Sequence, residues 1–378
     1  MFFKRGKFLT GKILLLLVVL LVLSSGLTVF GCVRAGAVAR GWSGGIIAED
    51  TLFVGSMAGK LVAIDVATHN RQWPDVPFEM KQTGGFGCAP TSTAVAIYGT
   101  PAVSGDLVHI SGYNGKIYAI STESGALRWV YPREGELEPI IGGPVVASDK
   151  LYIGSSDGWL YALDAATGDR KWAFETGGKI WSTPSIGGDT VYVGSFDKKL
   201  YALNTIDGSK KWDFETVGTI AATPLVYDNT VYIGSFDRYL YALNATDGSL
   251  RWKFLAQNWF WASPVAYDGV VYAGSLDGKV YALKAENGEK IAEFDLGSPV
   301  SSSPTLAGSS IIVATQEGKV YALDTGNYQK RQLTNLEEEI YAPLSVSDGV
   351  VYIHSDKDTL YAVDAQSGVT LWSLSLKS

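Results

Sequence analysis

The stretch TPSIGGDTVYVGSFDKKLYALNTIDGSKKWDFE (residues 183–215) contains one complete unit of a repeat and decides the fold. Four short segments can be distinguished in it, at residues 183–186, 190–195, 200–204 and 210–215. Apolar and polar residues alternate along them, which is typical of half-buried strands rather than helices. In the equivalent units Asp-Gly pairs separate the second and third segments and favour tight hairpins. Each unit therefore predicts a four-stranded antiparallel meander.

The unit recurs along most of the chain. Aligning on its Tyr-Ala-Leu motif places anchor residues at Val62, Tyr118, Tyr161, Tyr201, Tyr241, Tyr281, Tyr321 and Tyr361. Successive anchors are separated by 56, 43 and then five times by 40 residues. Self-similarity at a fixed period of this length indicates a repeat architecture.

A proline stands seventeen residues before most anchors. It occurs at Pro101, Pro144, Pro184, Pro224, Pro264 and Pro304, and Pro343 is displaced by one residue in the last unit. Proline cannot donate to a strand ladder and is confined mainly to edge strands. The first strand of each unit therefore has a free edge, which a propeller supplies by lining its central channel with the innermost strand.

A tryptophan recurs eleven residues after the anchor, at Trp73, Trp129, Trp172, Trp212, Trp252 and Trp372. One large ring per unit on the outer strand suits the wedge between neighbouring sheets. We therefore predict an all-β fold, an eight-bladed β-propeller of four-stranded antiparallel blades over residues 41–378. Ala292 and Gln332 replace the tryptophan in two units, and Ala314 and Tyr328 replace glycines in the seventh, so we expect the loosest packing between blades there.

The segment ALDAATGDRKW (residues 162–172) resembles the tryptophan-docking motif of PQQ-like, quinoprotein-type propeller repeats, and similar copies end at Trp129, Trp212, Trp252 and Trp372. The resemblance spans nearly everything from Trp42 to Trp372. It is specific for the fold and not for the function, because many unrelated activities share one fold.

The N-terminus has the order of an export signal. Lys4, Arg5, Lys7 and Lys12 precede an apolar run at residues 13–23, and small residues follow. Val29, Gly31 and Cys32 resemble the lipobox of bacterial lipoproteins, although Phe30 departs from it. Residues 1–31 are therefore a signal peptide ahead of a lipidated Cys32 and a tether at residues 32–40, or residues 13–33 are an uncleaved anchor. Both alternatives place the propeller outside the cytoplasm.

Charge and cysteine usage exclude several classes of protein. The formal net charge of the chain is -7, and residues 1–31 carry only positive charges, so the remainder is more acidic still. An acidic surface repels phosphate backbones, and we expect no nucleic-acid partner. With only two cysteines, Cys32 and Cys88, a disulfide framework is excluded.

The position twenty residues before the anchor is the strongest candidate site. It is aromatic at Trp42, Tyr98, Trp181 and Trp261, with Tyr341 equivalent after a one-residue deletion, while Ile141, Ala221 and Ser301 fill the other units. In a meander blade this link lies on the same face as the hairpin between strands two and three. The side chains would surround the mouth of the channel, where they either stack on a ligand or partner or merely plug the channel.

Other features carry weaker expectations. The segment between Trp73 and Pro101 has sixteen extra residues, including GGFGCAP at 84–90, and is a binding loop or a tolerated insertion. Cys88 has no histidine near it in sequence and is more consistent with an inert thiol than a nucleophile. Asp157, Asp197, Asp237 and Asp277 fit hairpin chemistry better than calcium binding. His69, His109 and His354 fall at unmatched positions, so we expect no metal site and no catalytic residue.

Three functions are compatible with these observations. A lipid-anchored propeller without further domains resembles the propeller lipoproteins of the outer-membrane β-barrel assembly machinery, which implies a non-catalytic envelope scaffold with a protein partner, a monomeric ring and no cofactor. An extracytoplasmic sensor would use the aromatic channel mouth to bind a ligand. A quinoprotein dehydrogenase would need a pair of adjacent cysteines, a catalytic aspartate and a calcium site, for which the sequence offers no convincing residues.

Overall fold

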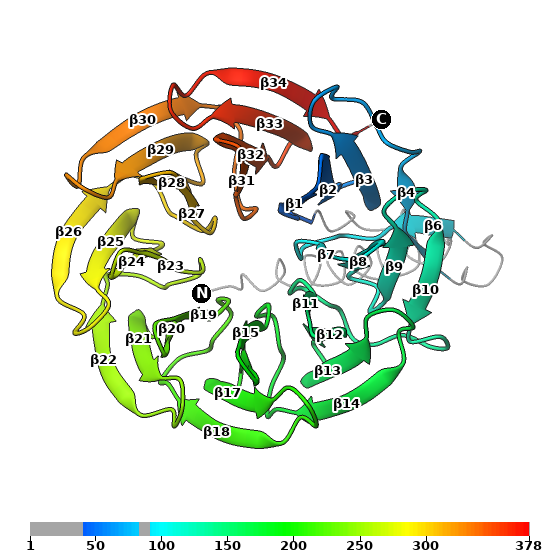
Figure 1. Ribbon diagram of the computed structural model, residues 1–378, viewed down its shortest axis with the longest axis horizontal. Coiled ribbons are helices and arrows are strands. Elements are labelled where there is room, and N and C mark those ends of the chain that lie inside the picture. The colour runs from blue at the N-terminus through cyan, green and yellow to red at the C-terminus, as the bar shows by residue number, and fades with distance from the viewer. Residues whose placement is uncertain (1–40, 83–90, 378) are drawn as a thin grey trace, which may run out of the picture. The chain divides into compact units, whose positions relative to one another are not determined.

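The computed structural model describes residues 41–82 and 91–377, which form 34 strands. Eight sheets of four antiparallel strands each are arranged around one axis (Figure 1), so the predicted eight-bladed propeller is confirmed. The blades are, in chain order, β1–β4 (Gly45–Ala48, Thr51–Gly55, Lys60–Asp65, Val76–Pro77), β7–β10 (Ala102–Ser104, Leu107–Ser111, Ile117–Ser121, Leu127–Tyr131), β11–β14 (Val145–Ala147, Lys150–Gly154, Trp159–Asp164, Arg170–Glu175), β15–β18 (Ser185–Gly187, Thr190–Gly194, Lys199–Asn204, Lys210–Glu215), β19–β22 (Leu225–Tyr227, Thr230–Gly234, Tyr239–Asn244, Leu250–Leu255), β23–β26 (Val265–Tyr267, Val270–Gly274, Lys279–Lys284, Lys290–Asp295), β27–β30 (Thr305–Ala307, Ser310–Ala314, Lys319–Asp324, Lys330–Asn335) and β31–β34 (Ser345–Ser347, Val350–His354, Thr359–Asp364, Thr370–Ser375).

The remaining two strands, β5 (Glu79–Gln82) and β6 (Thr91–Ala94), pair as a small separate sheet in the insertion between Trp73 and Pro101. Cys32 and Cys88 lie outside the described residues. Within the described part of the chain, no helix is long and apolar enough to cross a membrane.

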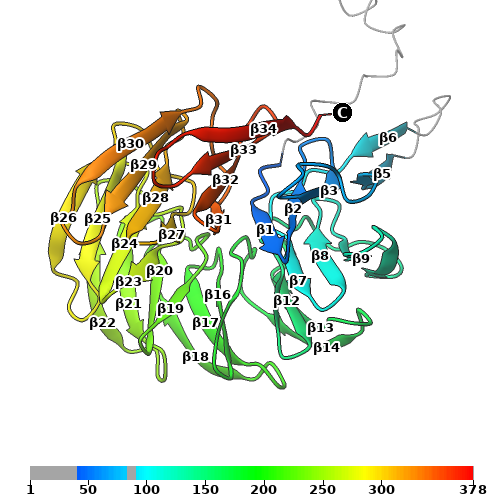
Figure 2. The same ribbon diagram turned by 45° about the horizontal axis from the view of Figure 1, so that its top comes forward.

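Strand order within each blade follows chain order from the axis outward (Figures 1 and 2). Pro184 immediately precedes the three-residue inner strand β15, so the missing amide proton falls just outside the ladder. The expected one-residue deletion in the last unit is wrong, because β31 begins at Ser345, forty residues after β27 begins at Thr305. Tyr341 is therefore in direct register with the other aromatic positions, and only Pro343 is out of place.

The hydrophobic core lies between blades rather than within them. In one cluster, Leu200 and Trp212 of the fourth blade pack with Val231 and Leu243 of the fifth. A propeller of this kind is stabilised mainly by the contacts that each sheet makes with its two neighbours.

Five of the recurring tryptophans connect consecutive blades by hydrogen bonds. Their indole N–H groups donate to carbonyls of the next blade at 2.9–3.2 Å, in the pairs Trp73–Thr122, Trp129–Ala165, Trp172–Thr205, Trp212–Ala245 and Trp252–Ala285. The hydroxyl of Tyr152 donates to the same Thr205 carbonyl as Trp172, at 3.2 Å. Gly208 has a φ of +74°, and a Cβ there would lie 2.6 Å from the Trp172 ring. Glycine is thus required both by backbone conformation and by the indole that rests on it.

At the two interfaces without a docking tryptophan, other residues fill the space. Tyr328 stands where other blades have the docking glycine, and it packs, as Ala292 does, against the same hydrophobic cluster. In the seventh blade the β-bulge is displaced, pairing Tyr321 with Gln332, and Leu333 instead packs into the core toward the eighth blade. One defect remains, because the buried Tyr272 hydroxyl has no hydrogen-bond partner among the described residues.

The ring closes without strand exchange in the described residues, since β1–β4 complete the first blade and β31–β34 complete the last (Figure 2). A buried side-chain pair joins the two ends. The imidazole of His354 contacts the Ser43 carbonyl and the Asp358 carboxylate, each at 2.9 Å. Asp358 also accepts a hydrogen bond from the Met57 amide at 2.9 Å. These four residues help to hold the first blade against the last.

His109 occupies the position that Tyr152 holds in the next blade, and it makes the poorest use of it. The imidazole is fully buried 5.5 Å from the Trp129 ring, and neither nitrogen has a partner in the described structure. Burial lowers the pKa of His109 from 6.5 to about 4. The folded protein therefore holds this imidazole neutral where an unfolded chain would protonate it.

We expect His109→Tyr to raise the free energy of unfolding at pH 7 by about 1 kcal/mol, because a tyrosine hydroxyl can donate to the Ala165 carbonyl. The contribution of His109 to stability is complete above its unfolded pKa and decreases as the pH falls from 6.5 to about 4. Urea unfolding at pH 7 and pH 5 should therefore show the variant's advantage widening by about 1 to 2 kcal/mol. An advantage that stays constant between the two pH values would contradict this account.

Candidate functional site

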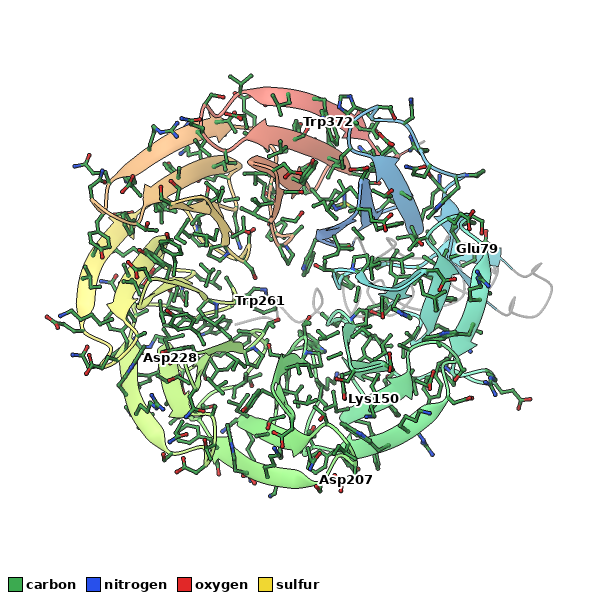
Figure 3. The ribbon with its side chains drawn as sticks, in the orientation of Figure 1. Glu79, Lys150, Asp207, Asp228, Trp261 and Trp372 are labelled. Carbon is green, nitrogen blue, oxygen red and sulfur yellow. The ribbon has the colours of Figure 1, made fainter. Side chains whose placement is uncertain are left out.

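All five predicted aromatic residues meet at one pocket on the axis of the ring. Trp42, Tyr98, Trp181, Trp261 and Tyr341 line it together with Ile141, Ala221 and Ser301, which hold the same position in the other three blades. The pocket has an empty volume of about 590 Å³, including the space open to solvent. Figure 3 shows Trp261 close to the axis, whereas Trp372 lies on the outer part of the ring.

The rim residues are positioned by the loops that join the outer strand of one blade to the inner strand of the next. The aromatic rim side chains are half-buried, and all but Trp42 immediately follow a buried apolar residue, such as Ile180 before Trp181 and Phe260 before Trp261. The buried residue fixes the loop in the core and leaves the next side chain facing the channel mouth.

Aromatic contacts hold the rim side chains in place. Trp42 packs edge-on against Tyr98 with ring centroids 4.6 Å apart and also contacts Tyr341 at 5.6 Å. Trp261 stacks on Phe236 at 5.5 Å, and Phe236 in turn stacks on the exposed Trp259 at 4.6 Å. These contacts orient the rings before any ligand arrives, which reduces the entropy lost on binding.

Two further contacts fix individual rings. The Trp181 indole lies 4.5 Å from the Phe196 ring and donates to the Ser156 hydroxyl at 3.1 Å. The Tyr341 hydroxyl donates to the Glu339 carboxylate at 2.8 Å. Burial and this carboxylate raise the pKa of Tyr341 to about 12, and burial also raises the pKa of Tyr98.

A second ring of residues lies two positions further along the same loops and carries hydroxyl groups in five blades. These residues also line the pocket, and they are Thr100, Thr183, Thr223, Ser263 and Ser303. The Thr183 hydroxyl accepts a hydrogen bond from the Gly143 amide at 2.8 Å, and the Ser303 hydroxyl accepts one from the Ser263 amide at 3.1 Å. A hydroxyl that accepts still has its own proton to donate, so these groups can contact a ligand as donors.

No charged side chain is among the described residues that line the pocket. The lining therefore combines aromatic faces, hydroxyls and backbone groups. The quinone cofactor of quinoprotein propellers carries carboxylates, which would need arginine or lysine partners when buried. This lining does not suit that cofactor, and we derive no catalytic step through it.

The regularly spaced aspartates belong to the hairpins. Asp197 accepts from the Lys199 amide at 3.0 Å and from the Tyr201 hydroxyl at 2.6 Å, and the same pattern recurs at Asp157, Asp237 and Asp277. Asp197 also accepts from the Gly177 amide of the preceding loop at 2.6 Å. The described residues contain no cluster of three or more potential metal ligands. Four of the anchor tyrosines thus donate a hydroxyl hydrogen bond that the sequence analysis did not anticipate.

Three neighbours of the rim were also missed at the sequence level. Tyr113, Phe196 and Phe236 share one position, five residues before the anchor, in the hairpin between the second and third strands. Aligning the repeats at this position and at the rim position would have revealed aromatic residues at both. The same alignment would have shown the hydroxyl residues two positions after the rim.

The fold and the site define the class of protein, in which eight repeats of the PQQ-like type form one propeller around an aromatic channel mouth. The sequence profile of the family described as "Outer membrane protein assembly factor BamB" matches residues 34–174, 89–213 and 173–374. Since these matches cover most of its length, the chain belongs to this family. The resemblance to PQQ-like propeller repeats is thereby confirmed.

Two solved structures illustrate the similarity. The crystal structure of BamB from Moraxella catarrhalis has a TM-score of 0.66 and 21% sequence identity, covering 89% of this chain and 94% of that one. The computationally designed Ika8 protein has a TM-score of 0.70 and 15% identity, with 89% and 96% coverage. At these identities the likeness shows the fold alone. No curated protein matches this sequence.

Proposed function

We propose that this chain is a non-catalytic, extracytoplasmic binding scaffold of the cell envelope that acts in outer-membrane protein assembly through a protein partner. The match to the assembly-factor family is the observation that carries the proposal. The N-terminal sequence supports it, with residues 1–31 as signal peptide or anchor, Cys32 as the lipid attachment site, residues 32–40 as a tether and residues 41–378 as the propeller.

Exposed apolar residues beside the channel mouth provide a surface for the partner. Val217 lies in the loop that carries Ala221 and is 76% exposed, and Trp259 lies in the loop that carries Trp261 and is 43% exposed. The loop of Val217 is held in shape, because the Val217 amide donates to the Asp237 carboxylate at 2.9 Å. Large apolar side chains presented on ordered loops are typical of protein interfaces.

Site-specific photo-crosslinking in intact envelopes tests this surface. A photoreactive residue at position 217 or 259 should crosslink to a component of the outer-membrane assembly machinery. The matched control is position 206, because Ile206 is equally exposed, at 72%, but lies in the turn between β17 and β18 on the opposite face. Equal crosslinking from position 206, or none from 217 and 259, would overturn the proposed scaffold role.

A further inference from the structure

The rim has an uneven arrangement of large and small side chains that creates space for a ligand. Following the ring from the fourth blade, Trp181, Ala221, Trp261, Ser301 and Tyr341 alternate between aromatic and small. A tryptophan also occupies this position in the first blade, at residue 42, so the fold tolerates a large ring here. The small residues between the aromatic rings therefore leave space in the rim, although the backbone could accommodate a large side chain at these positions.

Hydroxyl groups are present at these gaps. Thr223 follows Ala221 by two residues, and Ser303 follows Ser301 in the same way, all four lining the pocket. The Ser301 hydroxyl is itself buried and has no hydrogen-bond partner among the described residues. Buried hydroxyls are nearly always paired, and an unpaired one in a pocket indicates a polar contact still to be made.

We propose that the channel-mouth pocket binds a neutral saccharide. A sugar ring has an apolar C–H face that can lie against the rings of Trp181, Trp261 and Tyr341, and hydroxyls around its edge that can pair with Thr183, Thr223 and Ser303.

The absence of charged groups from the described lining argues for a neutral ligand. Burying an anion or a cation is costly unless an opposite charge accompanies it. The described residues that line the pocket include no charged side chain of either sign. A quaternary ammonium ion is the one charged group for which aromatic rings alone can compensate. It is therefore the alternative that the experiment must distinguish.

This site is separate from the protein-binding surface proposed above, since neither Val217 nor Trp259 lines the pocket. The saccharide proposal therefore does not depend on the identity of the partner. The two proposals can also be distinguished by one substitution. Val217→Ala should weaken partner crosslinking and leave saccharide binding unchanged.

The test is a titration of the full-length chain in a detergent without a sugar headgroup, in which tryptophan fluorescence and calorimetry measure binding. The probes are maltotriose, cellotriose and triacetylchitotriose as neutral saccharides, and tetramethylammonium chloride as the cation. We expect at least one trisaccharide to bind. Trp261→Ala should weaken that binding at least tenfold, and Val217→Ala should leave it unchanged.

A second variant keeps the test independent of stability. Ala221→Trp fills one gap with the residue that three other blades already hold there, so the propeller should fold with an unchanged melting temperature and lose saccharide binding. Binding of tetramethylammonium without any trisaccharide would identify a cation site and overturn the proposal. It would also be overturned if no trisaccharide bound the wild-type chain, or if binding survived both Trp261→Ala and Ala221→Trp.

Discussion

Trp212→Ala is expected to lower the free energy of unfolding by about 3 to 5 kcal/mol, as for other buried large-to-alanine changes. The Trp212 side chain is buried between two blades, and its indole donates to the Ala245 carbonyl at 3.1 Å. That carbonyl keeps its second donor, the Tyr192 hydroxyl at 3.1 Å. The loss should therefore come chiefly from the cavity rather than from the hydrogen bond. Guanidinium unfolding followed by far-ultraviolet circular dichroism measures it.

Two comparisons separate these contributions. Trp212→Phe keeps much of the buried aromatic volume while it removes the N–H donor and part of the ring, so its cost should be clearly smaller than that of Trp212→Ala. Ile206→Ala, at an exposed turn of the same blade, should change stability by less than about 0.5 kcal/mol. If Trp212→Ala were no more harmful than Ile206→Ala, the tryptophans would not hold the blades together.

Ala292→Trp is expected to destabilise the protein, by about 1 to 3 kcal/mol, although it restores the residue that most blades hold at this position. For five of the six tryptophans a glycine receives the indole, as Gly288 receives Trp252, where a Cβ would lie 2.6 Å from the ring. At the interface of Ala292 the receiving residue is Tyr328. The introduced indole and the tyrosine ring would compete for one space.

The double variant Ala292→Trp with Tyr328→Gly should recover most of the lost stability. It recreates the tryptophan–glycine pair of the other blades, and Tyr328 has a φ of +55°, a conformation that suits glycine. Thermal unfolding of the wild type, both single variants and the double variant gives the coupling energy between the two sites. Additive effects would mean that Tyr328 does not replace the missing tryptophan.

The sequence allowed the fold to be predicted almost completely, because most blades repeat the same proline, tyrosine and tryptophan at fixed spacing. The spacing of Trp172 and Gly208 reflects a contact that recurs at five of the interfaces between blades. The same regularity predicted the rim, and the structure does place Trp42, Trp181 and Tyr341 around one pocket. Column comparison works where each copy of a repeat meets the same physical demand.

The features that the sequence analysis missed involve residues whose contacts occur at a single interface and do not repeat from blade to blade. His354 and Asp358 stand at positions that are glycine in several other blades, and only the structure shows that they reach Ser43 and Met57 across more than 300 residues of chain. Tyr328 looked like a defect because the change that it compensates, at Ala292, lies 36 residues earlier. Pairings of this kind depend on the curvature of the ring, which no single repeat encodes.

The closure of the ring without an exchanged strand among the described residues has an evolutionary consequence. Because every described blade is a continuous stretch of chain, duplication of one forty-residue gene segment would add a whole sheet whose two flanks already match their neighbours. Such a protein can change its diameter in steps of one copy, and selection would then act mainly on the residues where the first and last blades meet. The near-identical length of the central copies is what a history of such duplications would leave.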